Sequence, residues 1–365
     1  MEIISYKKNF KLYIKNGLIC ILVFALMAEI ILNSSYISKG IILSSKYCLE
    51  ILIPSLFPFM FLSRFVIASE MLSFLKKPLN KITKFIFYLP GACAPAIFLS
   101  LIGGYPIGAT GAKTLIENKE INSEQLNRML SFSVNAGPAF FIDIVGRTIL
   151  KNNFLGITVF IIQVCISIFL GIILGIISRI KKIPYYSKNE NKGKNKTLSE
   201  SIIKSTSETS ISIINMCSLI LVFNVVISVL EKFLTVKNEF YILIISCLEI
   251  TSGCMQAEKI HASLPLICFC LAYSGICTHL QISSILSGEK FNYKKFQLFR
   301  ILNATLLYLA SYMFLKFFKC ETQVFFSSKN VGSPSISSTI LGSSFLLILC
   351  IYFIVEQNKI FLNKK

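Results

Sequence analysis

The sequence predicts an all-α polytopic membrane protein with two inverted repeats, a re-entrant hairpin in each repeat and about eight spanning helices. The first reason is composition, because 54% of the 365 residues are apolar and only 15% are charged, which excludes an ordinary soluble protein. The second is that several apolar runs approach or reach the ~20 helical residues that cross a hydrocarbon core. The third is that both halves of the chain carry breaks in their apolar sequence at corresponding positions.

The predicted spans are the long apolar runs. The first run follows a lysine-rich start and resembles a signal peptide, but no clean Ala-x-Ala site follows it, so we interpret it as a retained anchor helix. A segment at residues 41–68 is expected to return inward, interrupted by Pro54 and Pro58. The clearest spans cover residues 17–32, 154–177, 211–230, 264–286, 302–318 and 338–355.

Basic residues gather in clumps between the apolar runs. The net charge of +19 invites a nucleic-acid interpretation. The clumps instead follow the positive-inside pattern, in which Lys and Arg stay in the cytoplasm. We therefore expect no nucleic-acid partner and a multi-pass membrane protein with both termini cytoplasmic. The clumps lie at residues 7–15, 76–84, 179–196, 290–295 and 364–365.

A polar, basic stretch divides the chain and is too poor in apolar residues to pack a core, so it predicts a mobile cytoplasmic linker. If all basic clumps lie in the cytoplasm, one apolar segment in each half must enter and leave the membrane on the same side. We expect residues 85–107 to form such a hairpin from the cytoplasm and residues 241–252 to form one from outside. The predicted domains are an N-terminal anchor helix (1–38), a first membrane repeat (39–180), the linker (181–204), a second membrane repeat (205–290) and C-terminal helices (291–365).

The first candidate binding element is the loop GGYPIGATG at residues 103–111. Its glycines and proline cannot continue a lipid-facing helix, and broken backbone survives in a bilayer only inside protein or beside a cavity. Small residues also serve close helix packing. The aromatic face of Tyr105 and the rigid turn at Pro106 favour substrate binding, and Gly104 and Gly108 belong to the same predicted site.

The second candidate element is the NAGP sequence at residues 135–138. Pro138 lacks a backbone donor and clashes one turn back, which frees a carbonyl near Val134. Asn135 either binds substrate or a cation, or satisfies the broken backbone, and both interpretations stay open. Gly137 completes this part of the predicted site.

Two charged residues follow that break. Asp143 and Arg147 are four residues apart and therefore share one helix face. Ionisable residues at membrane depth are costly and usually functional. Arg147 is a candidate attractor for an anionic substrate, with Asp143 holding it in place; the alternative is that Arg147 anchors the helix at the membrane interface.

The second half has matching breaks at residues 251–253 and 274–275. Glu249 and His279 stand beside these breaks at a similar predicted depth. They form either a proton-coupling pair or a simple hydrogen bond between helices. The other substrate-binding candidates in this half are Ser252, Gly253, Gly275 and Gln281.

The sequence carries no catalytic signature, since it has neither a G-x-S-x-G elbow nor an H-E-x-x-H pair. The twelve cysteines lack zinc or redox spacing, and most lie in apolar runs, where a free Cys behaves as a small hydrophobe. We therefore expect no enzyme activity, no cofactor and no metal site.

Several motifs together resemble the YlbJ-like sporulation integral membrane proteins, which belong with the nucleoside-recognition (Gate) domain proteins. They are PSLFPF at 54–59, GYPIGA at 104–109 and NAGPAF at 135–140, followed by LEITSG at 248–253 and SGICTHLQ at 274–281. The chain departs from the family at residues 132–135, where the family often has a cysteine and a doubled asparagine. It also departs at Ser274, which replaces a glycine.

The resemblance implies a role in spore formation, in which such proteins move dipicolinic acid across the outer forespore membrane. Dipicolinate is a planar aromatic dianion, so Tyr105 would stack on it, helix N-termini would meet its carboxylates, and Arg147 would supply counter-charge. Two alternatives stay open: a carrier of nucleosides or other small molecules, and a non-transporting sporulation scaffold. Membrane lipid is a partner in each case, and a homo-oligomer is also left open.

Overall fold

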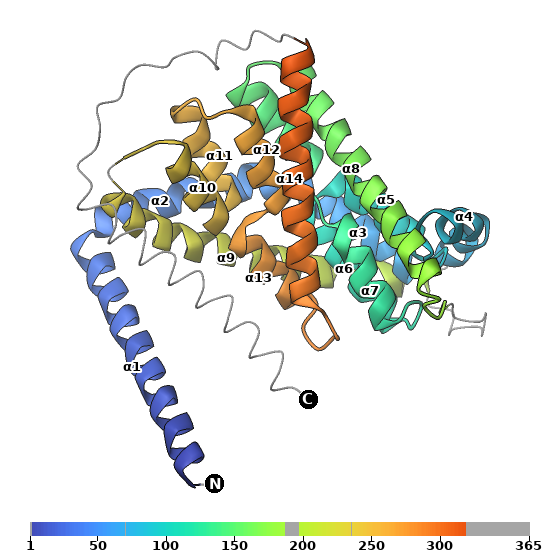
Figure 1. The fold of residues 1–365 in the computed structure, drawn as a ribbon, viewed down its shortest axis with the longest axis horizontal. Coiled ribbons are helices and arrows are strands. Elements are labelled where there is room, and N and C mark those ends of the chain that lie inside the picture. The colour runs from blue at the N-terminus through green and yellow to red at the C-terminus, as the bar shows by residue number, and fades with distance from the viewer. Residues whose placement is uncertain (1, 70, 187–196, 235, 319–365) are drawn as a thin grey trace.

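The computed structural model describes residues 2–69, 71–186, 197–234 and 236–318, and every regular element in these ranges is a helix (Figure 1). The elements in chain order are α1 (Glu2–Leu32), α2 (Ser34–Tyr47), η1 (Cys48–Leu52), α3 (Ile53–Ala68), α4 (Met71–Phe87), α5 (Cys93–Gly103), α6 (Tyr105–Glu117), α7 (Ser123–Ser133), η2 (Ala139–Ile149), α8 (Asn153–Ile180), α9 (Leu198–Phe233), α10 (Glu239–Leu248), α11 (Ile250–Lys259), α12 (Leu264–Tyr273), α13 (Gly275–Ile285) and α14 (Tyr293–Phe318).

Four helical stretches within the described ranges are long and apolar enough to cross a membrane: Asn153–Ile180, Leu198–Lys232, Leu264–Ile285 and Tyr293–Phe317. The third of these consists of α12 and α13 together. The count becomes five if Asn16–Leu32 and Ser34–Glu50, which meet at 94°, form one broken span. The described residues therefore provide fewer spans than the eight expected. The predicted span at 338–355 and the middle of the predicted linker lie outside the described residues.

Local sequence explains where several helices begin. Their N-cap side chains accept hydrogen bonds from backbone amides of the first turn, which otherwise have no partner inside the helix. The capping residues are Asn122 for α7, Asn152 for α8, Thr197 for α9, Asn238 for α10 and Glu249 for α11.

The predicted interruption of residues 41–68 takes a different form from the one expected. The chain stays helical from α2 through α3, with a π-helical turn at η1. Pro54 lies in the first turn of α3, where its missing N–H costs little, and Pro58 lies inside the helix. The prolines therefore do not open a gap in the helical backbone.

Two helical hairpins overlap the predicted ones but have different bounds: α5 and α6 cover residues 93–117 instead of 85–107, and α10 and α11 cover residues 239–259 instead of 241–252. A Cβ atom on Gly111 in α6 would lie 2.9 Å from the Cβ of Ala96 in α5, so these helices fold back on each other around Gly104. A Cβ on Gly253 in α11 would lie 2.7 Å from the Cα of Ser246 in α10. Residues 85–107 are thus not one straight helix.

Each hairpin packs against a broken helix. In the first half, the chain is non-helical between α7 and η2, and a Cβ on Gly137 would lie 3.2 Å from the Cα of Gly104. In the second half, α12 and α13 meet at Ser274 and Gly275, both with positive φ, and a Cβ on Gly275 would lie 2.6 Å from the carbonyl oxygen of Ser246. Each half thus contains one hairpin beside one break, and the inverted repeat itself stays a prediction.

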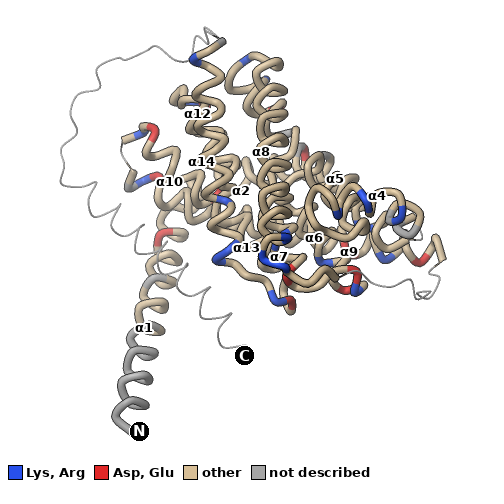
Figure 2. The backbone as a smooth tube through the Cα atoms, turned by 45° about the vertical axis from the view of Figure 1, so that its right-hand side comes forward, with Lys and Arg blue, Asp and Glu red and all other residues tan. Residues whose placement is uncertain are grey.

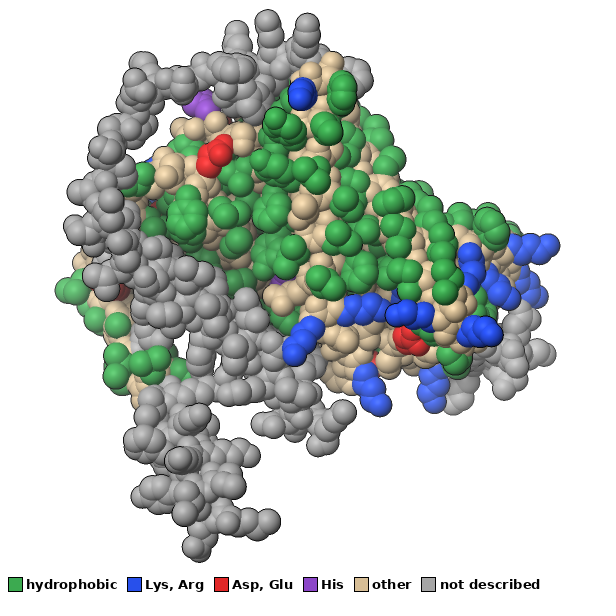
Figure 3. All heavy atoms as spheres, in the orientation of Figure 1, with side chains coloured by type: hydrophobic (Ala, Val, Ile, Leu, Met, Phe, Trp, Pro, Cys, Tyr) green, Lys and Arg blue, Asp and Glu red, His purple; other side chains and the backbone are tan. Residues whose placement is uncertain are grey.

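One end of the molecule is basic and the face beside it is apolar. Lys and Arg gather near α4, α7 and the segment before α14 (Figure 2), and they border a broad hydrophobic surface (Figure 3). Hydrogen bonds join loops at this end: Gln125 donates to the Tyr186 carbonyl oxygen over 2.8 Å, and the backbone N–H of Asn292 donates to Asn127 over 2.6 Å. This distribution is the one that the positive-inside rule expects.

Candidate functional site

A small, partly open cavity of about 20 Å³ lies at the hairpin tips of both halves, and residues of η1, α3 and α9 complete its wall. The first half contributes the α5–α6 turn and Phe140. The second half contributes the α10–α11 turn and part of α13. Five of the predicted site residues line this cavity, namely Gly104, Tyr105, Pro106, Glu249 and Gln281. The structure therefore brings together residues that lie far apart in the sequence.

Tyr105 connects the two halves. Its side chain is buried, and its ring centroid lies 5.8 Å from that of Phe140. Its hydroxyl donates a hydrogen bond to the carbonyl oxygen of Leu271, near the end of α12. The phenol group is thus fixed, and only part of the ring is available to the cavity.

Glu249 has a structural partner for each carboxylate oxygen. The two oxygens accept hydrogen bonds from the backbone N–H groups of Thr251 and Ser252, over 2.9 and 2.7 Å. A carboxylate at a helix N-terminus is favoured by these amides and by the helix dipole. The Ser252 hydroxyl in turn donates to Asn224 of α9 over 2.6 Å. Glu249 therefore holds the second tip in shape while bordering the cavity.

His279 lies among aromatic side chains and has no hydrogen bond to Glu249 among the described residues. Its Nε2 is 3.0 Å from the Tyr273 carbonyl oxygen, and its Nδ1 is 3.3 Å from the Tyr293 hydroxyl. The ring of Phe296 packs at 5.3 Å. His279 thus serves the broken backbone between α12 and α13, and it does not line the cavity at the tips.

Asn135 belongs to a buried polar network behind the first break. Its side chain donates to the Phe132 carbonyl oxygen over 2.9 Å and accepts from Gln163 over 3.0 Å. Asn303 of α14 adds a longer contact of 3.4 Å. Of the two interpretations left open, these contacts favour the one in which Asn135 satisfies the broken backbone.

Arg300 is a buried residue that was not among the predicted site residues. Its guanidinium donates to the carbonyl oxygen of Val134 at the first break and, over 3.4 Å, to that of Ala272 beside the second. The freed carbonyl predicted near Val134 thus receives its donor from α14. The signal in the sequence was an arginine within an apolar stretch.

The remaining predicted residues lie around the cavity or away from it. Asp143 and Arg147 form an ion pair of 2.9 Å on η2, as their spacing predicted, with half or more of each side chain exposed. Neither Asp143 nor Arg147 lines the cavity at the tips or the larger cavity described below. Gly108 packs on the end of α7, Gly137 and Pro138 shape the first break, and Gly253 and Gly275 make the close approaches of the second half.

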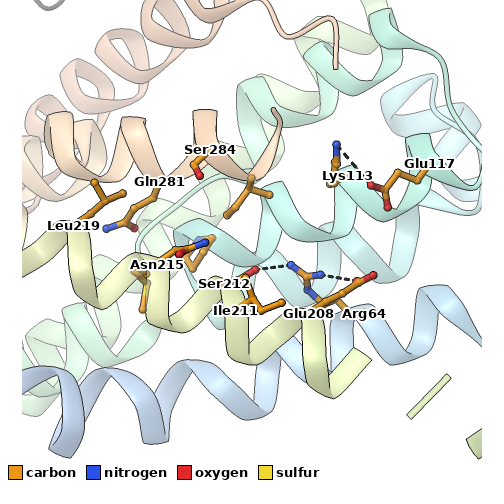
Figure 4. Close-up of a pocket in the computed structure, with 13 residues that line it drawn as sticks. Arg64, Lys113, Glu117, Glu208, Ile211, Ser212, Asn215, Leu219, Gln281 and Ser284 are labelled. Atoms are coloured by element: carbon orange, nitrogen blue, oxygen red, sulfur yellow. Dashed lines mark hydrogen bonds and ion pairs between the residues drawn. The ribbon is translucent and has the colours of Figure 1, made fainter. Parts of the chain in front are cut away.

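A larger cavity of about 280 Å³ adjoins the first (Figure 4). The two share Pro106, Met216 and Gln281 in their walls. We call the larger one the vestibule. It lies between α3, α6, α9 and α13, towards the C-terminal ends of α3, α6 and α13, and the sequence that follows α3 and α13 is basic. Its charged lining residues are Arg64, Lys113, Glu117 and Glu208, none of which was a predicted site residue.

Sequence reasoning missed this vestibule because its charges lie at the ends of predicted segments. Interface anchoring is the default interpretation of an arginine in such a position. The partner of Arg64 is Glu208, 144 residues further along the chain. Only the packing of α3 against α9 brings them together.

The fold thus defines an α-helical multi-pass membrane protein in which two broken hairpin units meet at a cavity lined by apolar residues and a few polar ones. The chain is similar to the sporulation integral membrane protein YlbJ of Bacillus subtilis (strain 168), with 23% identity over 304 residues, or 73% of this chain and 74% of that protein. This similarity confirms the resemblance to YlbJ-like proteins that the motifs predicted. No family model and no solved structure matches the chain, and the Gate-domain relationship stays a prediction.

Proposed function

We propose that this chain is a membrane transporter for a small anionic molecule, with dipicolinic acid in the outer forespore membrane as the leading candidate. The observation that carries the proposal is the cavity lined by hairpin tips from both halves. Unwound backbone at membrane depth is tolerated only inside protein or beside a water-filled cavity. Paired broken elements around a central site are typical of secondary carriers.

The chemistry of the site suits an anion. The N-terminus of α6 begins at the first tip, and helix N-termini attract negative charge, whereas at the second tip Glu249 already caps the N-terminus of α11. In the vestibule, Arg64 and Lys113 supply positive charge, which Glu208 and Glu117 balance until a ligand displaces one of them. The sporulation role of the similar protein and the planar dianionic character of dipicolinate agree with this arrangement.

The two cavities differ in size, which suggests a direction of access. The vestibule approaches the ~300 Å³ lower limit of typical ligand pockets, whereas the tip cavity is far below it. Substrate would therefore enter through the vestibule from the cytoplasmic side, and the tips would separate to admit it. An inverted repeat, as the sequence predicts, would provide two such tips, one for each side of the membrane.

Uptake by purified protein in proteoliposomes tests the proposal, with radiolabelled dipicolinate as the probe. Gly108→Leu should abolish uptake, because even a Cβ at this position would lie 2.8 Å from the Ser133 carbonyl oxygen, where α6 meets the first break. The matched control is Gly17→Leu, since a Cβ at Gly17 would meet no atom within 4 Å. The protein amount in the vesicles should be equal for both variants.

Other outcomes would contradict the proposal. Uptake of uridine with no uptake of dipicolinate would indicate a nucleoside carrier instead. A scaffold would transport neither compound, and its sporulation phenotype would depend on residues 187–196 and tolerate Gly108→Leu. Normal dipicolinate uptake by Gly108→Leu would remove the hairpin tip from the transport site.

A further inference from the structure

Arg64 is a nearly buried cation on the wall of the vestibule. Only 9% of its side chain is exposed, although it borders a cavity of about 280 Å³. Its Nη1 lies 2.6 Å from a carboxylate oxygen of Glu208, and its Nη2 donates to the Ser212 hydroxyl over 2.7 Å. Within the described residues, its Nε–H has no hydrogen-bond partner. The guanidinium is thus only partly satisfied.

Glu208 has a second cation within reach. Its other carboxylate oxygen lies 3.6 Å from the Nζ of Lys204, one turn earlier on α9. About a third of the Glu208 side chain is exposed, against half of that of Lys204. Glu208 can therefore leave Arg64 and still pair with Lys204. Arg64 then needs another carboxylate in place of Glu208, because an unpaired buried charge is costly.

We propose that Arg64 is a carboxylate-binding subsite of the vestibule and that Glu208 occupies it until a small carboxylate anion displaces it. A guanidinium presents several N–H donors in a planar fork that matches a carboxylate. Glu208 engages Nη1 of this fork, and a carboxylate that displaces Glu208 would take over this donor. Ser212 and Asn215 offer further polar groups on the same wall (Figure 4).

The position of this subsite gives it a role in the proposed transport. The vestibule continues to the tip cavity past Pro106 and Gln281. An anion held at Arg64 would wait at the entrance to the hairpin tips. The subsite rests on the proposed function only in this last respect, since carboxylate binding can be measured without transport.

Equilibrium binding to the purified full chain tests the subsite, with radiolabelled dipicolinate and, separately, pyridine-2-carboxylate as probes. Glu208→Gln should strengthen binding about tenfold, because the internal competitor loses its charge. Arg64→Gln should weaken binding by about tenfold or more. The double variant Arg64→Gln/Glu208→Gln leaves no unpaired charge in this pair, so it should fold and still bind weakly.

A matched control separates displacement from a general effect of charge. Glu117 lines the same cavity, but its carboxylate pairs with Lys113 over 3.6 Å. Glu117→Gln should therefore change carboxylate binding much less than Glu208→Gln does. Equal effects of the two variants, or tight binding by the double variant, would overturn the subsite.

The proposed function and the subsite fail in different ways. Carboxylate binding that responds to Arg64 and Glu208, without uptake into vesicles, would support the subsite and contradict the transporter. Uptake that is lost in Gly108→Leu but unchanged in Arg64→Gln would support the transporter and contradict the subsite. Binding of neither carboxylate by the wild-type chain would overturn the subsite.

Discussion

Two arginines in this chain have opposite surroundings. Arg147 pairs with Asp143 on the surface, where 63% of its side chain is exposed, and a pair of this kind contributes about 0–1 kcal/mol. Arg300 is fully buried and donates to carbonyl groups beside both helix breaks. These carbonyls stand near the C-terminal ends of α7 and α12, where an intrahelical donor is lacking and the dipole favours a cation. Arg300 therefore stabilises both breaks at once.

Removing Arg300 should destabilise the whole fold. Arg300→Met leaves the carbonyls of Val134 and Ala272 with one donor fewer each, and a buried unsatisfied polar group costs about 1–3 kcal/mol. We expect a clearly lower Tm for the purified variant in detergent, and a smaller decrease for Arg300→Lys. The control Arg147→Met should keep the wild-type Tm. An unchanged Tm for Arg300→Met would show that the breaks do not depend on this residue.

At the level of elements, sequence patterns predicted the hairpins and breaks but not the partners of their polar groups. Glycine and proline act through the local backbone, so the turn at Gly104 and the break at residues 135–138 are visible in the chain itself. The surroundings of Arg64, Asn135 and His279 depend on helices distant in sequence, and spacing alone carries no information about that packing. The π-helical turn η1 was likewise not predicted from the sequence. The interruption expected at Pro54 does not occur, because proline in a first helical turn does not interrupt a helix.

The close contact inside the second hairpin yields a prediction for this element. Gly253→Ala adds only a methyl group, but that atom would lie 2.7 Å from the Cα of Ser246, so α11 must move away from α10. Overpacking of this kind costs about 1–3 kcal/mol. We expect a lower Tm for Gly253→Ala, whereas Gly17→Ala should be neutral or slightly stabilising. A Gly253→Ala variant as stable as the wild type would contradict the hairpin geometry.

For the whole molecule, the hairpins determine which loops share a side. Both ends of the α5–α6 hairpin lie on one side, as do both ends of the α10–α11 hairpin, because each hairpin returns towards its start. The loop hydrogen bonds at the basic end place residues 118–127, 186 and 290–292 together. If the basic end lies in the cytoplasm, as the positive-inside rule predicts, the loops at residues 150–152, 236–238 and 260–263 face the opposite side.

Fusions to reporter proteins test this sidedness. Alkaline phosphatase requires disulfides, which form outside the cytoplasm, so fusions after Asn152 and Lys237 should be active. Fusions after Tyr186 and Glu289 should be inactive, and green fluorescent protein at the same four positions should give the inverse pattern. Phosphatase activity after Tyr186 would place the basic end outside, and the vestibule with Arg64 would then open away from the cytoplasm. Active fusions after both Tyr186 and Lys237 would instead show that α9 does not cross the membrane, and the paired arrangement of the two hairpins would be lost.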